Sequence, residues 1–470
     1  MLTLNDAYNL IHEGSLALAR AERQGIRVDV EYGEKQKRIL TKRINREYRL
    51  FEKTKLCNLW KKIYGTKTNL DSDHQLAKLL YTTLKLTPPK TTEKGKQGST
   101  DKESLLQLEK DVPEIKQVLQ IRKLLKVRDT YLDAYLREQT DGFIHPFFNL
   151  HTVRTYRSSS DRPNFQNIPK RDEEASNICR RALLPRPRNQ LLEIDFSGLE
   201  VSIAACYHKD PTMLKYLKDP DSDLHRDMAK QIFMVDNFNA KEYSEHSLLR
   251  KATKNGFVFP QFYGDYYGNN AVGLCSWVDL PRGKWASGQG IKLPGGTYIS
   301  DHLISKGVKS FDDFVEHMKQ IEDDFWNRRF KTYKRWKKSW IRKYHQRGYI
   351  QMLTGFICSE IMGEKEAINY PIQGSAFHCL LWTFIQVDKA AQEENWQTKL
   401  IGQIHDSIIF DVHPPELEHV AKTVHKIATE ELPKAWPWII VPLEVDMELT
   451  PIDGAWSEQE SYYPMEAEGG

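Results

Sequence analysis

The spacing of apolar residues along this chain predicts amphipathic helices mixed with short strands. Apolar residues recur every three or four positions in 34–62 and again in 115–135, as they do on one face of a helix. A helical pattern ends at Gly25, and the IRVDV that follows it is typical of a short strand. Two apolar runs, LLEI at 191–194 and IGQI at 401–404, also predict strands. The chain is therefore expected to be an α/β (α+β) protein.

Each of the two apolar runs leads to a carboxylate. Asp195 follows the first run directly, and Asp406 lies between the second run and another apolar segment. A carboxylate beside a buried strand is costly unless it binds a cation or hydrogen-bond donors. Mg²⁺ prefers oxygen ligands, and two such ions can stabilise an in-line phosphoryl displacement. The pair predicts phosphoryl transfer; two ordinary turn acids are the plainer alternative.

Five segments, in order along the chain, resemble the motifs of the family A DNA polymerases, the group related to bacterial DNA polymerase I. They are TYRSSSDRPNFQNIP (155–169), DFSGLE (195–200), RKATKNGFVFPQFYG (250–264), EKEAINYPIQGSA (364–376) and QIHDS (403–407). The resemblance implies a right-hand polymerase with an antiparallel palm sheet and a mostly helical thumb and fingers. It also implies a nucleotidyltransferase that adds dNTPs to a primer 3′-OH on a DNA template and releases pyrophosphate.

The same resemblance divides the chain into subdomains. We expect a thumb with an N-terminal lead-in at 1–130, a first palm segment at 131–200, fingers at 201–350 and a second palm segment at 351–470. A Gly- and Pro-rich stretch at about 271–310 is longer than the family's usual connection, so it is expected to be an insertion in the fingers. The insertion and the unusual fingers motif are more similar to bacteriophage members than to bacterial repair enzymes.

The resemblance assigns the metal ligands. Asp195, Asp406 and the backbone carbonyl of Phe196 would hold two Mg²⁺ ions, for which Mn²⁺ could substitute. One ion would lower the pKa of the primer 3′-hydroxyl, and the other would hold the triphosphate and the leaving pyrophosphate. Ser407 stands where the family usually has a second acid, so the negative field here is expected to be weaker.

A second group of residues would bind the incoming nucleotide. Its members are Glu200, His225, Arg250, Lys254, Phe259 and Tyr263. Arg250 and Lys254 share a helical face that can grip a triphosphate, and Lys254 could act as a catalytic acid that protonates the pyrophosphate. Glu200 would exclude a ribose 2′-OH, and the two aromatic residues would stack on the base or sugar. The alternatives are an exposed helical glutamate, a structural histidine and core aromatic residues.

The fingers motif departs from the family by one residue. Lys254 and Tyr263 are nine positions apart where the family has eight, and the intervening segment contains Gly256 and Pro260. Proline lacks the N–H that a regular helix needs, and an extra residue can be absorbed as a π-bulge. A kinked or bulged helix is therefore expected between 255 and 261.

Polar residues in three of the motifs match family positions near the primer end and the minor groove. They are Arg157, Lys365, Asn369, Gln373 and His405. Donors at such places can reach acceptors that all base pairs share, which tests pair geometry without reading sequence. Lys365 replaces a family Arg, so a bidentate contact would be lost. Asn164, Gln166 and Asn167 are further candidates that either contact the same strand or cap turns.

Composition adds limits on location and on the source of DNA affinity. The net charge is only +4, so local basic clusters must supply the affinity for primer-template DNA. The run at 327–347 could contact a DNA backbone or pack with a charged outer face, and the Lys-rich 87–104 could touch phosphates or be a solvated linker.

Six cysteines without metal-binding spacing predict reduced thiols and a cytoplasmic protein. No apolar run approaches 18 residues, so a membrane role is disfavoured, and a monomer is expected.

Three other functions compete with DNA synthesis. A single-subunit RNA polymerase has the same arrangement of palm acids, although Glu200 argues against this function. A catalytically inactive DNA-binding accessory protein would not need Asp195 and Asp406, and a metal nuclease would not need the nucleotide-binding group. An exonuclease is not expected, because only 28 residues precede the acidic pair in Asp29-Val30-Glu31, which is interpreted as structural.

Overall fold

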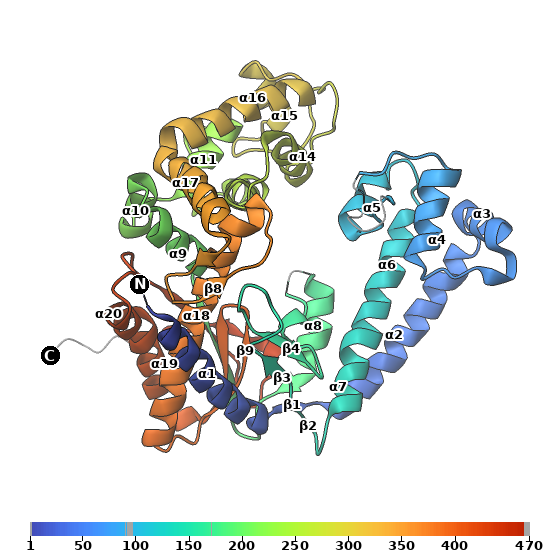
Figure 1. Ribbon diagram of the computed structural model, residues 1–470. Helices are drawn as coiled ribbons and strands as arrows, with labels where there is room; N and C mark the ends of the chain where they lie inside the picture. Colours follow the sequence, from blue (N-terminus) through green and yellow to red (C-terminus); the bar gives the residue numbers. More distant parts are fainter. Residues whose placement is uncertain (1, 90, 92–96, 171, 465–470) are drawn as a thin grey trace.

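The computed structural model describes residues 2–89, 91, 97–170 and 172–464. Two helical arms rise from a region that contains the largest sheet (Figure 1). The first arm contains α2 to α7, and the second contains α10 to α17. Each arm has its own hydrophobic core, and a third core surrounds the sheet.

The central sheet has five antiparallel strands in the order β12-β11-β6-β10-β9. The strands are β6 (Gln190–Phe196), β9 (Lys399–Ile404), β10 (Ser407–Val412), β11 (Val445–Leu449) and β12 (Glu460–Ser461). The register pairs Asp195 of β6 with Ser407 on one side and Asp446 on the other. The predicted antiparallel sheet, built from two distant apolar runs, is confirmed.

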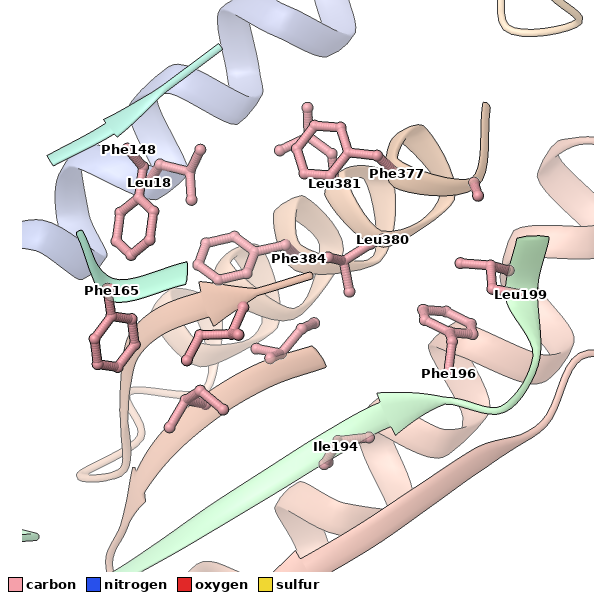
Figure 2. Packing of buried hydrophobic residues seen from close by; sticks show 14 of the residues in the cluster. Leu18, Phe148, Phe165, Ile194, Phe196, Leu199, Phe377, Leu380, Leu381 and Phe384 are labelled. Carbon is pink, nitrogen blue, oxygen red and sulfur yellow. The ribbon is translucent and has the colours of Figure 1, made fainter. Parts of the chain in front are cut away.

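Helices cover this sheet and connect it to the arms. They are α1 (Leu4–Gln24), α8 (Glu173–Arg181), α9 (Leu199–His208), α18 (Glu364–Glu393), α19 (Leu417–Lys426) and α20 (Leu432–Ala435). Figure 2 shows Ile194 and Phe196 of β6 on the side of the sheet where Leu380 and Phe384 of α18 pack. Alternation along β6 therefore buries one set of side chains in this core and turns Asp195 to the opposite face.

Small strands complete the base of the molecule. They are β1 (Ile26–Val28), β2 (Phe143–Ile144), β3 (Phe147–Asn149), β4 (Ser159–Asp161), β5 (Leu183–Leu184), β7 (Ile350–Gln351) and β8 (Ile357–Cys358). β1 pairs with both β2 and β5, whereas β3–β4 and β7–β8 are two-stranded. The predicted strand after Gly25 is therefore present.

The first arm is an assembly of short and long helices. They are α2 (Val30–Phe51), α3 (Lys55–Tyr64), α4 (Asp73–Ala77), α5 (Lys102–Leu108), α6 (Ile115–Leu125) and α7 (Asp133–Glu138). The helix predicted over 34–62 is in fact two helices, because Thr54 caps the second one by accepting from the Cys57 N–H. The helix predicted over 115–135 continues from α6 into α7 through a π-helical turn, Lys126–Leu132.

The acidic pair at the start of the first arm is structural, as predicted. Asp29 is the N-cap of α2, where its carboxylate accepts from the Tyr32 N–H at 2.9 Å. It also pairs with Arg181 at 3.4 Å. The lysines expected to touch phosphates in 87–104 lie largely outside the described residues, since 90 and 92–96 are not among them.

The second arm contains eight helices among the residues that the structure describes. They are α10 (Pro211–Lys218), α11 (Leu224–Phe233), α12 (Ser244–Thr253), α13 (Phe259–Phe262), α14 (Tyr267–Trp277), α15 (Ile299–Ser305), α16 (Phe311–Asp324) and α17 (Lys331–Arg347). Trp285, Leu293 and Ile299 of the expected insertion are buried in this arm's core. The 271–310 segment is therefore packed against the arm rather than projecting from it.

The bulge predicted in the fingers motif is present. Between α12 and α13, Lys254–Val258 forms a π-helical turn. The Phe259 N–H donates to the Lys254 carbonyl, five positions back, so the extra residue is accommodated there. Pro260 then occupies the first turn of α13, where a missing N–H does no harm. Lys254 is thus the first residue of the bulge, and Phe259 and Tyr263 follow it.

The basic run at 327–347 has one packed face and one exposed face. Trp336 and Trp340 of α17 stack with ring centroids 5.3 Å apart. The indole of Trp340 donates to the Ala367 carbonyl, and the Tyr344 hydroxyl donates to the Glu360 carbonyl at 2.9 Å. The packing interpretation is confirmed for this face. Within the described part of the chain, no helix is long and apolar enough to cross a bilayer.

Gly374, in the motif at 364–376, is a point where α18 and the motif at 155–169 come into close contact. A Cβ at this position would lie 2.4 Å from the Thr155 carbonyl oxygen and 2.9 Å from the Met352 sulfur. We expect Gly374→Ala to lower the free energy of unfolding by about 2 kcal/mol, because the backbone at Thr155 would have to shift. Urea denaturation measures this. Gly307→Ala, which has no neighbour within 4 Å but a φ of +95°, separates crowding from backbone strain. An unchanged midpoint for Gly374→Ala would contradict the expectation.

Candidate active site

The fold brings Asp195 and Asp406 together at one end of the central sheet. Asp195 is near the end of β6, and Asp406 is in the tight His405–Asp406 turn between β9 and β10. The Phe196 N–H donates to the Asp406 carbonyl oxygen at 3.1 Å, which fixes the turn against β6. Ser407 is buried, and its hydroxyl closes the same turn by donating to the Ile404 carbonyl. The serine therefore has a structural role here.

The two carboxylates have unusual electrostatics. Burial raises the pKa of Asp195 to about 7; Lys170 opposes the rise, and Glu193, Asp406 and Asp446 add to it. Burial also raises the pKa of Asp406 to about 6, against the opposing charge of Arg157. Both acids are thus held where ionisation is unfavourable without an added cation.

The site fits a bound divalent cation, although it provides few ligands. Oδ1 of Asp406 is buried and accepts no hydrogen bond from the described residues; its nearest cation is Arg157, at 3.5 Å. In the described part of the chain, no cluster of three or more His, Cys, Asp or Glu side chains could hold a metal. Two carboxylates are enough for Mg²⁺, which usually keeps water and substrate phosphate oxygens as its other ligands.

Three charged neighbours of Asp195 were missed by the sequence analysis. Lys170 Nζ is 3.8 Å from Asp195 and 3.5 Å from Glu193. Asp446, opposite Asp195 on β11, accepts from the Ser197 hydroxyl at 2.5 Å. The period-two spacing of 193 and 195 predicts a shared face, but the contribution of β11 and Lys170 depends on sheet order.

Glu200 is held at the start of α9 by two partners. Its carboxylate accepts from Arg157 Nη1 at 2.9 Å and from the Tyr263 hydroxyl. Because Arg157 also pairs with Asp406, these residues connect the metal-ligand candidates to the fingers motif. Glu200, Tyr263 and Asp406 border a cavity between α9, α13 and α18 that is also lined by Phe259.

The other nucleotide-binding candidates lie beyond Phe259 on the second arm. Burial, together with the nearby charges of Arg250 and Lys254 and against that of Asp223, lowers the pKa of His225 to about 4, so the ring is neutral at pH 7. His225 meets Phe259 edge-on at 5.8 Å, and Lys254 Nζ lies 5.3 Å from the same ring. Arg250 is paired with Asp223 at 2.6 Å. The fold thus gathers these four residues on one surface.

The primer and template candidates in the first and last motifs are partly engaged in hydrogen bonds within the protein. The Gln166 amide donates to Ser158 and to the buried Gln403, at 2.6 and 3.0 Å, so its side chain joins the first and last motifs. Asn167 is linked through its backbone carbonyl, which accepts from Tyr131. Gln403 also donates to the carbonyl of the exposed His405. Sequence analysis missed Gln403, although it lies inside the QIHDS motif.

Three candidates lie on the first turns of α18. Lys365 is exposed beside the end of the fingers motif, since a Cβ on Gly264 would be 3.4 Å from its Cε. Asn369 lines the cavity that Glu200 borders. Gln373 is half-buried one turn further along. The helix therefore presents these residues from the end of the fingers motif toward Asp406.

Comparison with known proteins identifies the family. The model of DNA polymerase family A matches residues 41–287 and 301–455. The chain belongs to DNA polymerase family A. The unmatched residues 288–300 of this family A chain fall within the segment expected to be an insertion.

Individual relatives agree with this assignment. The chain is 29% identical over 400 residues to DNA polymerase I of Lactococcus lactis subsp. cremoris (strain MG1363), covering 83% of the chain and 40% of the relative. It is 28% identical over 456 residues to DNA polymerase I of Bacillus subtilis (strain 168), covering 94% and 45%. The chain thus spans less than half the length of these relatives.

A solved structure shares the fold. The POL domain of Pol1 from M. smegmatis, in complex with DNA primer-template and dNTP, matches with a TM-score of 0.71 and 23% identity. The match covers 95% of this chain and 70% of that one. The predicted family A architecture, with its antiparallel sheet and helical arms, is therefore confirmed.

Proposed function

We propose that this chain is a DNA-directed DNA polymerase that extends a primer 3′ end with dNTPs and releases pyrophosphate. One observation carries the proposal. The β6 end and the β9–β10 turn bring Asp195 and Asp406 together beside the cavity that Glu200 and Tyr263 border. Two candidate metal ligands beside a recess lined by Phe259 and Tyr263 suit phosphoryl transfer better than simple DNA binding.

Asp195, Asp406 and the carbonyl of Phe196 would hold two Mg²⁺ ions, with Mn²⁺ as a substitute. When bound, the ions would stabilise the attacking and leaving oxygens of an in-line displacement. Arg157 pairs with Asp406 and Glu200 in the free protein, so it can turn from these acids to the primer strand without moving far. Lys170 partly neutralises Asp195 before a cation arrives.

Arg250, Lys254 and His225 would receive the triphosphate. Arg250 is oriented by Asp223, and its remaining N–H groups can form charge-assisted hydrogen bonds to phosphate oxygens. Lys254 is the proposed general acid for pyrophosphate. Neutral His225 can donate one hydrogen bond without adding charge. Phe259 and Tyr263 would stack on the base or sugar.

The primer and template would lie across the sheet between the two arms. Gln166, Asn167, Asn369, Gln373 and His405 are proposed to contact the primer end or the minor groove, with Lys365 nearer the fingers. We propose that the first arm is the thumb, the sheet region the palm and the second arm the fingers; the boundaries at 130, 200 and 350 remain predictions. A monomer and a cytoplasmic location are also proposed, consistent with six free, buried cysteines.

Primer extension tests the proposal directly. A labelled primer on a DNA template, Mg²⁺ and one dNTP at a time should give extension only with the complementary nucleotide. Binding without extension would favour an inactive accessory protein, and primer shortening would favour a metal nuclease. Equal use of rNTPs and dNTPs would favour the RNA polymerase alternative.

Cation binding should depend on pH because protons compete for the same carboxylates. The pKa of Asp195 is raised to about 7, so below that pH a cation must displace a proton from the folded protein. We expect Mn²⁺ affinity, measured by electron paramagnetic resonance, to fall by up to about tenfold per pH unit between pH 7 and 5.5. It should be nearly constant above pH 8. Asp195→Asn should bind weakly with a flatter pH dependence; equal wild-type affinity at pH 5.5 and 8 would refute the expectation.

A further inference from the structure

The exposed face of α17 carries an unusual concentration of uncompensated positive charge. The helix contains eight Lys and Arg residues and no Asp or Glu. The six exposed cations are Lys331, Arg335, Lys338, Arg342, Lys343 and Arg347. None of these six forms an ion pair with any residue that the structure describes. This face is called the α17 basic face below.

The cations form a stripe rather than a scatter. Lys331, Arg335, Lys338 and Arg342 are spaced by four, three and four residues, which places them on one side of the helix. The opposite side is held in the protein by Tyr333 and the stacked tryptophans, so the stripe cannot turn inward. Closely spaced like charges repel one another, and an anionic partner would relieve that repulsion.

The two ends of the stripe differ. Near the beginning of α17, a surface hollow is lined by the acids Glu316, Glu322, Asp323 and Asp324 and by the cations Lys319, Arg328 and Lys334. Because the charges there are mixed, with more acids than cations, this end attracts phosphates less strongly. The C-terminal half, from Lys338 to Arg347, contains only cations among its charged residues, and the partly exposed Tyr349 follows it. Cations beside an accessible aromatic ring are typical of single-stranded nucleic-acid surfaces.

Hydrogen bonds connect this half to the entrance of the candidate active site. The Tyr344 hydroxyl donates to the Glu360 carbonyl and accepts from the Met362 N–H at 2.7 Å. Trp340 donates to the Ala367 carbonyl, so α17 is fixed on both sides of Lys365. Lys365 in turn lies beside Gly264, next to Tyr263. Figure 1 shows α17 running from the second arm toward α18.

We propose that the C-terminal half of the α17 basic face binds the phosphates of the unpaired template strand ahead of the site of synthesis. The inference rests on the proposed function, because it needs a template that leaves the site past Tyr263 and Lys365. The half-helix is about 14 Å long, enough for a few phosphates. The contact is electrostatic and independent of sequence, as expected of a surface that every template passes.

The test compares primer-templates that differ only in the length of the 5′ template overhang. Wild-type protein should bind a 12-nucleotide overhang about tenfold more tightly than a one-nucleotide overhang at low salt. The triple variant Lys338→Gln/Arg342→Gln/Lys343→Gln should lose this gain and bind the one-nucleotide overhang as wild type does. Its salt dependence on the long overhang should be lower by about 2 in log–log slope, at about 0.7 per phosphate.

A matched variant controls for net charge. Lys422→Gln/Lys426→Gln/Lys434→Gln also removes three positive charges, two from α19 and one from α20, where each lysine pairs with a glutamate. It should keep the overhang gain. If the α17 variant still binds the long overhang more tightly than the short one, the proposal is overturned, and an acidic protein becomes the alternative partner of the α17 basic face. Equal weakening on short and long overhangs, or no gain in wild type, would also overturn it.

Failure of the proposed function would look different. The overhang measurement records binding and needs no catalysis, whereas single-nucleotide extension on the one-nucleotide overhang measures synthesis alone. The α17 variant should extend that substrate at the wild-type rate. Absence of extension by the wild-type protein would refute the polymerase proposal, whereas the overhang-dependent binding would still test the α17 proposal.

Discussion

Asp406→Asn is expected to lower the rate of primer extension by at least about 10³-fold, equivalent to about 4 kcal/mol in the activation barrier. The substitution keeps the shape of the side chain in the β9–β10 turn but removes the charge next to Asp195. Its backbone carbonyl can still accept from Phe196, so the turn should persist. A neutral amide is a poor ligand for Mg²⁺, and the attacking and leaving oxygens would lose their stabilisation. Single-turnover extension with saturating dNTP measures the loss.

DNA affinity separates a chemical defect from a folding defect. Asp406→Asn should bind primer-template within about twofold of wild type, since removing one buried negative charge does not weaken attraction for phosphates. Asp29→Asn is the matched exchange of carboxylate for amide, at an N-cap where Asn serves as well as Asp. It should extend primers normally. Extension by Asp406→Asn at one tenth of the wild-type rate or faster would remove Asp406 from the proposed metal site.

The core of the site could be predicted from the sequence because it depends on local pattern. An apolar strand that ends in an acid is visible in the chain, and the motif order places two such strands in one sheet. The π-bulge was also predictable, because an extra residue close to Pro260 does not fit a regular α-helix. The π-helical turn Lys254–Val258 accommodates that residue. Both inferences use spacing along a single segment.

The parts that could not be predicted depend on register and on side-chain choice. Asp446 faces Asp195 only because β11 is the neighbour of β6, and no residue near 446 specifies that order. The contact from Gln166 to Gln403 joins residues 237 positions apart. Arg250 could be placed on the correct helical face from its spacing, yet its pairing with Asp223 was not visible. Local periodicity carries no information on such long-range pairs.

For α17, the sequence left two roles open, and the structure shows that both can hold. Density of charge and interleaved tryptophans suggested two incompatible roles for one segment, packing or DNA contact. The structure makes them compatible, because Trp336 and Trp340 share one side of the helix and the stripe from Lys331 to Arg342 occupies the other. Helical period separates the two sets, so the alternatives are faces of one element.

Glu200→Ala is expected to reduce discrimination against ribonucleotides by about 10²-fold, measured as the ratio of kcat/KM for dNTP and rNTP. Glu200 is fixed by Arg157 and by the Tyr263 hydroxyl at the edge of the cavity, so its carboxylate cannot swing away from a 2′-OH without breaking both contacts. Alanine removes the bulk and the charge and opens room for the extra hydroxyl. Incorporation of dNTP should change much less, because the deoxyribose does not need the space.

Tyr263→Phe distinguishes the carboxylate from its partner. This variant keeps the ring and the Arg157 contact to Glu200 but removes one hydrogen bond, so the carboxylate stays close to its place. Discrimination should therefore fall by less than about tenfold, against about 10²-fold for Glu200→Ala. If Tyr263→Phe relaxes sugar selection as much as Glu200→Ala does, the barrier to ribonucleotides is the hydrogen-bonded pair rather than the bulk of the glutamate. If neither variant relaxes it, Glu200 does not face the sugar, and the orientation proposed for the nucleotide in this cavity is wrong.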